Sequence, residues 1–286
     1  MKTRKAVQRQ IRLAILSNAG GSGKTTAAVH LAYVIGVRGY KVTLIELDSN
    51  GSIQTFARLP PATSEKSLAA VLKKDFDGNY PLVPLWSEHI SNIWAIQGGA
   101  PLRESVVEIN NSERKSQTLR DRLEDYPLGS DLIIFDTPAS LDTMGLLALA
   151  ACTHLLAPIK PEYKDTGSFV DLLNWYNEKI RELRLKPRPV ILGFIPSRVD
   201  IGEEAIHRNL LGLTKQGKPN KKIPQEETLP FQIEQMGIHC FPLIRESSYY
   251  LWASGAGLPL HLYRPGCAFV DDFQPLVDAV EKLMTE

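Results

Sequence analysis

The chain has 286 residues, a length that suggests one large domain or two small ones. Hydrophobic residues make up 43% of the chain, which is enough for a sizeable core, and 33 basic against 32 acidic residues leave a net charge of +1. This balance excludes a protein whose overall charge drives it onto nucleic acid, so any DNA contact must come from a local basic patch.

The three cysteines, Cys152, Cys240 and Cys267, are widely spaced. Their odd number and the absence of C-x-x-C spacing argue against a disulfide framework and against a zinc site. No secretory signal stretch follows the basic start of the chain, and no apolar run approaches the ~18 residues of a membrane-spanning helix. We therefore expect a cytoplasmic protein.

Short apolar runs closed by Gly, Pro, Asp or Asn alternate with helical stretches along the chain. The expected strands are 11–16, 42–47, 132–135, 155–159, 190–195 and 240–244. The expected helices are 26–38, 67–73, 117–123, 144–151, 168–185 and 273–284. This alternation predicts an α/β fold with a doubly wound, mainly parallel sheet that is buried on both faces. Without a visible linker, residues 1–286 are expected to form a single domain, with 202–236 as an irregular excursion.

Residues 17–26 read S-N-A-G-G-S-G-K-T-T and lie between the first strand and the first helix. A glycine-rich turn that leads into a helix N-terminus aims successive backbone N–H groups and the helix dipole at an anion. The strict P-loop pattern G-x-x-x-x-G-K-[ST] is missed because Asn18 stands at its first glycine, and the remaining G-G-x-G-K-T is the deviant form. The expected phosphate-binding residues are Gly20, Gly21, Ser22, Gly23, Lys24, Thr25 and Thr26.

Two further apolar runs end in aspartate, at Asp48 and at Asp136. Ligands of a doubly wound sheet bind at the carboxyl ends of its strands, which places both carboxylates beside the P-loop. We expect Thr25 and Asp136 to hold Mg²⁺, Asp136 through a water molecule, and Asp48 to orient the attacking water. Lys24 is expected to bind the β- and γ-phosphates. Taken alone, an aspartate after a strand is as often a helix or turn cap.

Five segments in family order resemble the ParA/MinD family of deviant Walker ATPases. They are G-G-S-G-K-T-T, I-E-L-D-S-N-G, I-I-F-D-T-P-A-S, A-P-I-K-P-E-Y at 157–163 and G-L-P at 257–259. The resemblance implies a P-loop NTPase of the ParA-like type that binds ATP and forms a homodimer with two ATP molecules at its interface. It also implies slow ATP hydrolysis and ATP-dependent attachment to a surface.

The chain departs from this family just before the first glycine of the loop, where Ala19 replaces the signature lysine. In the family, that lysine reaches the phosphates of the partner subunit. Lys160, at the carboxyl end of the fourth expected strand, is our candidate for a relocated catalytic lysine. The alternative is a solvated lysine at a strand end. Glu46, in place of the first aspartate of the family's D-x-D pair, is a milder change.

Ala19 together with Lys160 narrows the resemblance to the McdA-type branch of the family, which positions carboxysomes. That branch implies the nucleoid as the matrix and an McdB-like adaptor on the cargo. A plasmid or chromosome partition ATPase is the nearest alternative. A metabolic ATP-dependent enzyme of the dethiobiotin-synthetase kind also lacks the loop lysine, and it would need substrate-specific polar groups at the dimer interface.

The base of the nucleotide has a weaker signature than the phosphates. In the family, an asparagine after the fifth strand meets the adenine, whereas Ser197 stands in that place here. No N-K-x-D guanine motif occurs, which favours ATP over GTP. We expect Ser197 and the segment around Arg245 to complete the nucleotide site.

A nucleoid-bound ATPase needs a cluster of lysine and arginine residues. The candidates are Arg181, Arg184, Arg188, Arg208, Lys215, Lys218, Lys221 and Lys222. These residues are equally consistent with solvated loops and helix faces. The last helix is acidic, so we expect no attachment to an anionic membrane. Cys152 beside a helix and Cys240 at the start of an expected strand give an iron–sulfur function little support.

Overall fold

The computed structural model of the chain describes residues 5–111 and 115–286. Among them, seven strands form one sheet in the order β3-β4-β2-β5-β1-β6-β7. All neighbouring strands are parallel except the antiparallel pair β3–β4. The strands are β1 (Ile11–Ile15), β2 (Val42–Glu46), β3 (Val83–Pro84), β4 (Ile93–Ile96), β5 (Leu132–Asp136), β6 (His154–Ile159) and β7 (Val190–Pro196). The expected doubly wound, mainly parallel sheet is confirmed.

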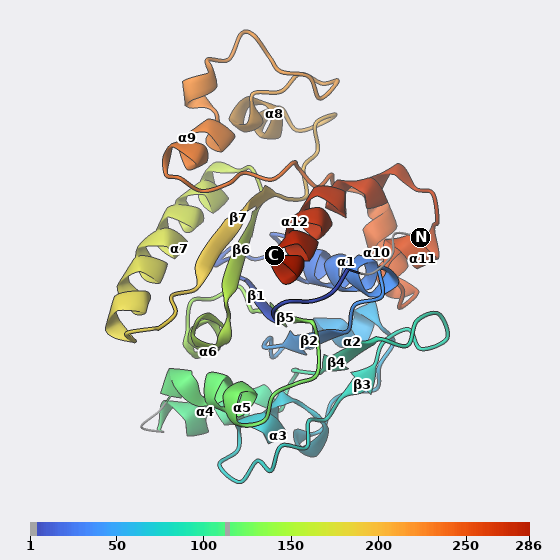
Figure 1. Cartoon of the computed structure of the whole chain (residues 1–286). Helices are drawn as coiled ribbons and strands as arrows, with labels where there is room; N and C mark the ends of the chain where they lie inside the picture. The colour runs from blue at the N-terminus through green and yellow to red at the C-terminus, as the bar shows by residue number, and fades with distance from the viewer. Residues whose placement is uncertain (1–4, 112–114) are drawn as a thin grey trace.

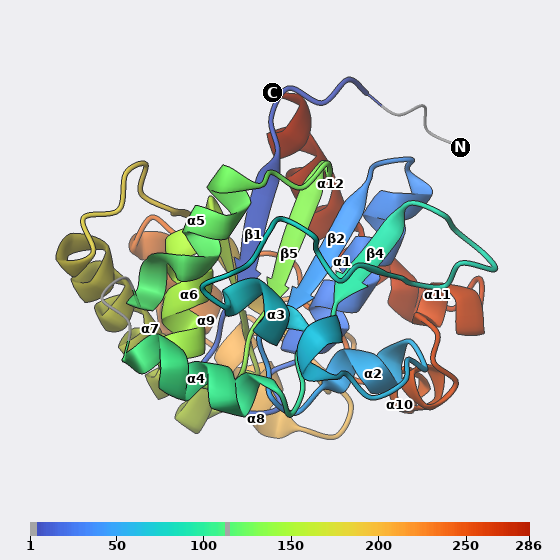
Figure 2. The same cartoon turned by 90° about the horizontal axis from the view of Figure 1, so that it is seen from below.

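Helices cover both faces of this sheet (Figure 1 and Figure 2). Helices α3 to α7 pack on one face, and α1, α10, α11 and α12 pack on the other. The helices are α1 (Lys24–Val37), α2 (Ser52–Phe56), α3 (Leu68–Leu72), α4 (Leu102–Asn110), α5 (Thr118–Asp125), α6 (Thr143–Ala151), α7 (Tyr163–Glu182), α8 (Ala205–Leu211), α9 (Leu229–Gln235), α10 (Ser248–Gly255), α11 (Leu260–Tyr263) and α12 (Gln274–Thr285). Because helices lie on both faces, the central strands are largely apolar.

The central strand β1 shows how the two faces are filled. Ile11, Leu13 and Ile15 belong to the hydrophobic cluster on the α1 side of the sheet. Ala14 and the following Leu16 belong to the cluster on the α6 side. Successive side chains of a strand point to opposite faces, so a strand buried on both faces has no polar repeat. This explains why short continuous apolar runs, rather than alternating ones, located the strands.

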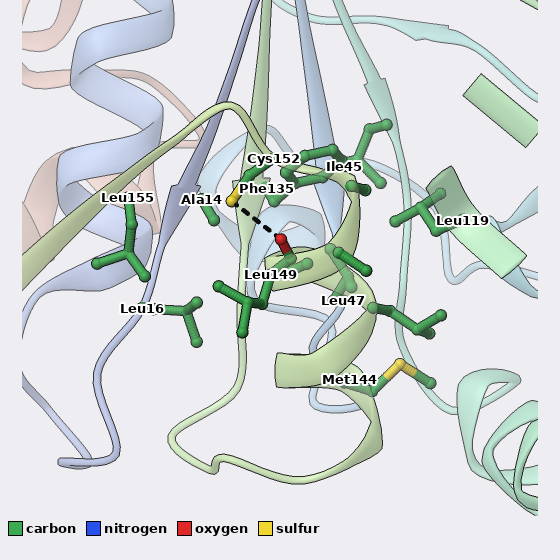
Figure 3. Close-up of a cluster of buried hydrophobic side chains, with 14 of the residues drawn as sticks. Ala14, Leu16, Ile45, Leu47, Leu119, Phe135, Met144, Leu149, Cys152 and Leu155 are labelled. Atoms are coloured by element: carbon green, nitrogen blue, oxygen red, sulfur yellow. Dashed lines mark hydrogen bonds between the residues drawn. The ribbon is translucent and has the colours of Figure 1, made fainter. Parts of the chain in front are cut away.

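Cys152 lies in the second of these clusters, at the end of α6 (Figure 3). Its Sγ donates a hydrogen bond to the carbonyl oxygen of Leu149 at 3.4 Å. Burial raises the pKa of this thiol to about 12, so the side chain stays protonated. Cys152 is therefore a packing residue.

Within 5–111 and 115–286, no three His, Cys, Asp or Glu side chains gather as a metal-binding cluster of their own.

The expected strand at 240–244 is wrong. Cys240 forms one isolated parallel bridge with Phe194 of β7, and no ladder follows it. Pro242 lacks the backbone N–H that a continuing ladder requires. The segment therefore runs beside β7 without joining the sheet, and it forms part of the wall of the cavity described below.

All six expected helices are present, but α7 begins at Tyr163, five residues before the expected 168. Gly167 conceals the start because glycine usually marks a break in a helix. The excursion 202–236 is also more ordered than expected, since it contains α8 and α9. Leu229 and Ile233 of α9 are buried in the same cluster as α7, and the excursion folds over the carboxyl end of β7 (Figure 1).

Two helical glycines give opposite expectations for the same substitution. A Cβ on Gly36 of α1 would lie 2.5 Å from Cδ1 and 2.6 Å from Cγ1 of the buried Ile93, whereas a Cβ on Gly167 of α7 would meet nothing within 4 Å. We expect Gly36→Ala to lower the free energy of unfolding by about 1–3 kcal/mol through overpacking. We expect the control Gly167→Ala to raise it by about 0.5–1 kcal/mol, because alanine favours the helix. Urea unfolding followed by circular dichroism measures both, and a Gly36→Ala protein as stable as Gly167→Ala would contradict the packing.

Candidate active site

The P-loop runs from the end of β1 into α1 and its conformation depends on glycine. Gly21 and Gly23 have φ angles of 73° and 86°, in the left-handed region. A Cβ on Gly23 would collide with the hydroxyl of Ser197 at the end of β7. The predicted base-side residue Ser197 therefore lies directly against the predicted phosphate loop.

Lys24 is the buried cation of this loop. Its side chain folds back so that Nζ donates a hydrogen bond to the carbonyl oxygen of Ala19 at 3.1 Å, and only 7% of the residue is exposed. Burial lowers the pKa of Lys24, and the carboxylates of Asp136 and Asp48 act in the opposite direction. The ammonium group is thus held in the turn where the expected phosphates would bind.

Thr25 and Asp136 meet as the sequence predicts. The Thr25 hydroxyl donates a hydrogen bond to Oδ2 of Asp136 at 2.8 Å, and Asp136 has no exposed surface. Burial raises the pKa of Asp136 to about 7, with a further contribution from the negative charge of Glu46. Its second oxygen, Oδ1, is buried and has no hydrogen-bond partner within the described residues. Oxygen donors of this kind suit Mg²⁺, so the residues present fit the metal that the fold implies.

Glu46 has a more specific role than a mild replacement of aspartate. It is fully buried, and its carboxylate accepts hydrogen bonds from the backbone N–H groups of Ile53 at 2.8 Å and Gly98 at 2.9 Å. Burial raises the pKa of Glu46, while these two hydrogen bonds act against the rise. Glu46 therefore links β2 to the start of α2 and to the residues that follow β4. These links hold the turn that carries Asp48 in place.

Asp48 lies in that turn and lines the cavity in front of the P-loop. Its Oδ1 accepts a hydrogen bond from the backbone N–H of Asn50 at 2.9 Å, and its carbonyl oxygen accepts one from Gly99 at 2.9 Å. The carboxylate is thus positioned at the mouth of the phosphate site by local turn geometry. Its role in orienting water stays a prediction.

The cavity in front of the P-loop has a volume of about 580 Å³. Its lining comes from the P-loop, the turn after β2, the end of β5, the end of β7 and the segment 244–251. A larger hollow of about 790 Å³ lies between α3, α4 and α5, and none of the predicted site residues lines it. The glycine loop and Lys24 make the smaller cavity the candidate nucleotide site.

The structure places Arg245 in the cavity wall, but its charge is already paired. Its guanidinium contacts the carboxylate of Asp272, with the shortest distance 2.6 Å, and lies over the ring of Phe269 at 4.7 Å. The hydrogen bonds to Asp272 raise the pKa of Arg245. These contacts make the side chain an anchor for the wall, so nucleotide contact by Arg245 stays a prediction.

Arg198 is a cavity residue that the sequence pattern does not single out. It directly follows Ser197, and its guanidinium donates hydrogen bonds to the carbonyl oxygen of Gly21 at 3.0 Å and to Oε1 of Glu246 at 2.7 Å. Only its position three residues after the expected strand 190–195 could have drawn attention to it. Gly21 is 177 residues away in the sequence, and no local pattern announces that contact.

Lys160 lies at the carboxyl end of β6, as expected, but it does not line the cavity of its own chain. Its Nζ lies 2.5 Å from Oε1 of Glu162, and its side chain is 25% exposed. The same carboxylate oxygen lies 3.7 Å from Nε2 of the buried His207. Lys160 is therefore close to the site and accessible, while its function in a partner's site stays a prediction.

The basic candidates for DNA contact do not form one patch. Lys215, Lys218, Lys221 and Lys222 are exposed in the loop between α8 and α9, beyond the carboxyl end of β7. Arg181, Arg184 and Arg188 are exposed at the far end of α7, whose 20 residues span about 30 Å. Arg208 is half-buried and donates to the carbonyl oxygens of Ile201 and Gly202. The two exposed groups lie at opposite ends of α7 (Figure 1).

The acidic last helix α12 packs its apolar face against the protein. Leu276, Val277 and Val280 are fully buried on the α1 side of the sheet. Of the acidic side chains, Glu281 is paired with Arg38 of α1 at 2.5 Å. No helix within 5–111 and 115–286 has the length and apolar character needed to cross a membrane.

His30 connects α1, and thereby the P-loop, to the segment that follows the G-L-P motif. Its Nδ1 hydrogen-bonds to the carbonyl oxygen of Thr26 at 2.7 Å, and its Nε2 accepts a hydrogen bond from the backbone N–H of Leu260 at 3.1 Å. The ring stacks on Phe273 with a centroid distance of 4.7 Å. Burial lowers the pKa of His30 to about 3, so the neutral ring is the folded form.

This burial makes stability depend on pH. In the unfolded chain His30 takes up a proton near its ordinary pKa of 6.5, whereas in the folded chain it does so only near 3. The free energy of unfolding should therefore fall below pH 6.5, by at most about 1.4 kcal/mol per pH unit from this residue. Urea unfolding between pH 7 and 5 should show a shallower fall in His30→Gln than in the native chain. The surface variant His89→Gln is the control, and equal slopes in His30→Gln and the native chain would contradict the prediction.

Comparisons with known proteins find one matching family and several similar proteins. Residues 10–186 match a protein family described as an AAA domain. A protein of Rhizobium rhizogenes named as a replication protein A is 27% identical over 60% of this chain, although the match spans only 45% of that protein. The sporulation initiation inhibitor protein Soj of Bacillus subtilis is 26% identical over 68% of this chain and 76% of Soj.

The fold also matches solved structures. Apo McdA of Cyanothece has a TM-score of 0.77 and 22% identity, with 95% of this chain and 100% of McdA covered. A structure of a variant of the same protein in complex with ATP gives the same TM-score. At this identity the likeness establishes the fold.

Proposed function

This chain belongs to the AAA-domain family, as a deviant Walker ATPase of the ParA/MinD type, and we propose that it uses ATP to attach to non-specific DNA and position a cargo. ATP and Mg²⁺ are its cofactors, in keeping with structures of this fold that hold ATP or Mg·ADP. Nucleoid association, an adaptor of the McdB kind and carboxysomes as the cargo are the finer parts of the proposal. The similarity to McdA and the pairing of Ala19 with Lys160 support them.

The residues of the cavity account for the proposed hydrolysis. The P-loop N–H groups and Lys24 bind the phosphate chain and hold it against the start of α1. The Thr25 hydroxyl and Asp136 would hold Mg²⁺, which when bound neutralises charge on the phosphates. Asp48 at the cavity mouth accepts a hydrogen bond from the attacking water and orients it.

The observation that carries the proposal is the position of Lys160. The loop has no lysine at position 19, and Lys160 stands at the nucleotide edge of the sheet but outside the cavity of its own chain. A lysine in that place is available to the phosphates of a second copy in an ATP-sandwich homodimer. To reach them it must leave Glu162, so the ion pair with Glu162 opposes dimerisation.

A chromosome or plasmid partition function is the second candidate, favoured by the match to Soj and to proteins named chromosome partitioning protein ParA. It uses the same cycle of ATP binding, DNA attachment and release, with a different cargo. The two candidates differ in the adaptor, and the same experiments on ATP and DNA apply to both.

Lys160→Ala should weaken ATP-dependent dimerisation at least about tenfold, because it removes a cation from a buried phosphate contact. Lys164→Ala, which removes an exposed cation four residues later, in the first turn of α7, is the matched control. Sedimentation or light scattering with Mg·ATP measures the dimer, and circular dichroism checks that the fold persists. Normal ATP-dependent dimers of Lys160→Ala would exclude the relocated lysine.

DNA attachment should depend on the loop between α8 and α9, because this loop lies beyond the carboxyl end of β7, on the edge of the sheet that holds the nucleotide. The triple change of Lys218, Lys221 and Lys222 to alanine should abolish ATP-dependent binding to plasmid DNA at moderate salt and reduce the slope of log K against log salt by about 3. The control is the triple change of Arg181, Arg184 and Arg188 to alanine, which removes the same charge from the far end of α7.

Binding should require ATP, and neither ADP nor nucleotide-free protein should replace it. Equal loss in the two triple variants would show that only total charge matters. Absence of DNA binding in every nucleotide state of the native chain would favour the metabolic-enzyme alternative and lead to assays with small-molecule substrates.

A further inference from the structure

Arg198 adopts a backbone conformation that arginine rarely takes. Its φ angle is 54°, in the left-handed region. The residues on either side are fixed, since the backbone N–H of Ser197 donates to the carbonyl oxygen of Ile159 at 2.8 Å and that of Val199 donates to Ile244 at 3.0 Å. Such a conformation persists only where the surroundings impose it, and it is common at ligand sites.

The side chain of Arg198 bridges two walls of the nucleotide cavity. Its Nη1 donates to the carbonyl oxygen of Gly21 in the P-loop at 3.0 Å, and its Nη2 lies 2.7 Å from Oε1 of Glu246. A Cβ on Gly21 would lie 3.1 Å from Nη1, so the guanidinium rests directly on the glycine turn. A guanidinium has five N–H donors, and these two contacts leave others for a ligand in the cavity.

The other cations near the site are either ion-paired or outside the cavity. Arg245 is neutralised by Asp272, and Lys160 does not line the cavity. Arg245 uses both Nε and Nη2 on Asp272, whereas Arg198 makes a single contact to Glu246 through Nη2. Among the described cations that line the cavity, Lys24 and Arg198 therefore keep the most donors for a nucleotide. Arginine binds phosphate oxygens in a planar, two-donor geometry that lysine cannot reproduce.

We propose that Arg198 binds the phosphate chain of the nucleotide held by its own chain, and that its ion pair with Glu246 competes with this contact. Arg198 thereby supplies, within one subunit, positive charge at a loop in which position 19 is alanine. The inference needs only ATP binding and does not depend on the dimer, the DNA or the cargo proposed above. Lys160 acts on a partner's phosphates in that proposal, whereas Arg198 acts in its own chain.

The test compares Arg198→Ala, Arg198→Lys and Glu246→Gln by the dissociation constant for Mg·ATP, measured with a fluorescent ATP analogue and competition by unlabelled ATP. Arg198 is exposed for 46% of its side chain, so these variants should fold. Arg198→Ala should weaken ATP binding about tenfold or more, and Arg198→Lys should recover part of the loss. Glu246→Gln should bind ATP at least as tightly as the native chain, because it releases the guanidinium and removes a negative charge.

Glu246→Gln separates phosphate binding from a purely structural bridge. If Arg198 only ties the P-loop to the opposite wall, then Glu246→Gln and Arg198→Ala should weaken ATP binding by similar factors, and that result would overturn the proposal. Unchanged ATP affinity in Arg198→Ala would overturn it as well.

Repeating the comparison in the Lys160→Ala background separates this inference from the proposed dimer. The loss of ATP affinity caused by Arg198→Ala should persist there with the same factor. In the two proposals, Arg198 contacts the nucleotide of its own chain and Lys160 contacts the nucleotide of the partner. A loss that disappears in that background would mean that Arg198 acts through the dimer, which contradicts binding within one chain.

Discussion

Two carboxylates buried next to each other constrain the whole nucleotide edge of the sheet. Glu46 and Asp136 are in register across β2 and β5, and neither has exposed surface. Two negative charges in such a place are unfavourable unless hydrogen-bond donors or a cation compensate them. The negative charges of Glu46 and Asp136 are compensated in different ways. Glu46 is satisfied by two backbone N–H groups, whereas Asp136 has the Thr25 hydroxyl on one oxygen and no partner on the other within the described residues. Glu46 is thereby structural, and Asp136 is left to face a cation.

The positions of the neighbouring groups follow from this arrangement. Glu46 fixes the backbone at Gly98, where a Cβ would come within 2.7 Å of the carbonyl oxygens of both Glu46 and Asp48. Only glycine allows β2 and β4 to end so close together, and this closeness holds the turn that carries Asp48. His30 joins the first turn of α1 to Leu260, so the helix that follows the P-loop is fixed to the C-terminal part of the chain. Preorganisation of this kind lets a loop bind phosphate without a large rearrangement.

Local sequence predicts the parts of this site that are themselves local. The P-loop and the aspartates at the ends of β2 and β5 are strand–turn signals within ten residues, and the fold follows from continuous apolar runs separated by helical stretches. Contacts between distant segments carry no such signal. The bond from Arg198 to Gly21 spans 177 residues, and the bond from Leu260 to His30 spans 230. The expected strand at 240–244 failed for a related reason. Its apolar composition suits a strand, but Pro242 and the packing against β7 decide that it forms a cavity wall instead.

The parallel sheet also explains why a cation at the phosphate site can come from different positions in the sequence. Every parallel strand delivers its carboxyl end to the same edge, so a cation lost at position 19 can be supplied from the end of β6 or of β7. The two available residues differ in their position relative to the cavity. Both are ion-paired, Lys160 with Glu162 and Arg198 with Glu246. Lys160 lies outside the cavity of its own chain, whereas Arg198 lines that cavity and donates to the P-loop carbonyl of Gly21. A lysine that lies outside the cavity of its own chain suits a contact that forms only when a second subunit arrives. A guanidinium already seated on the loop suits a contact made each time the nucleotide binds.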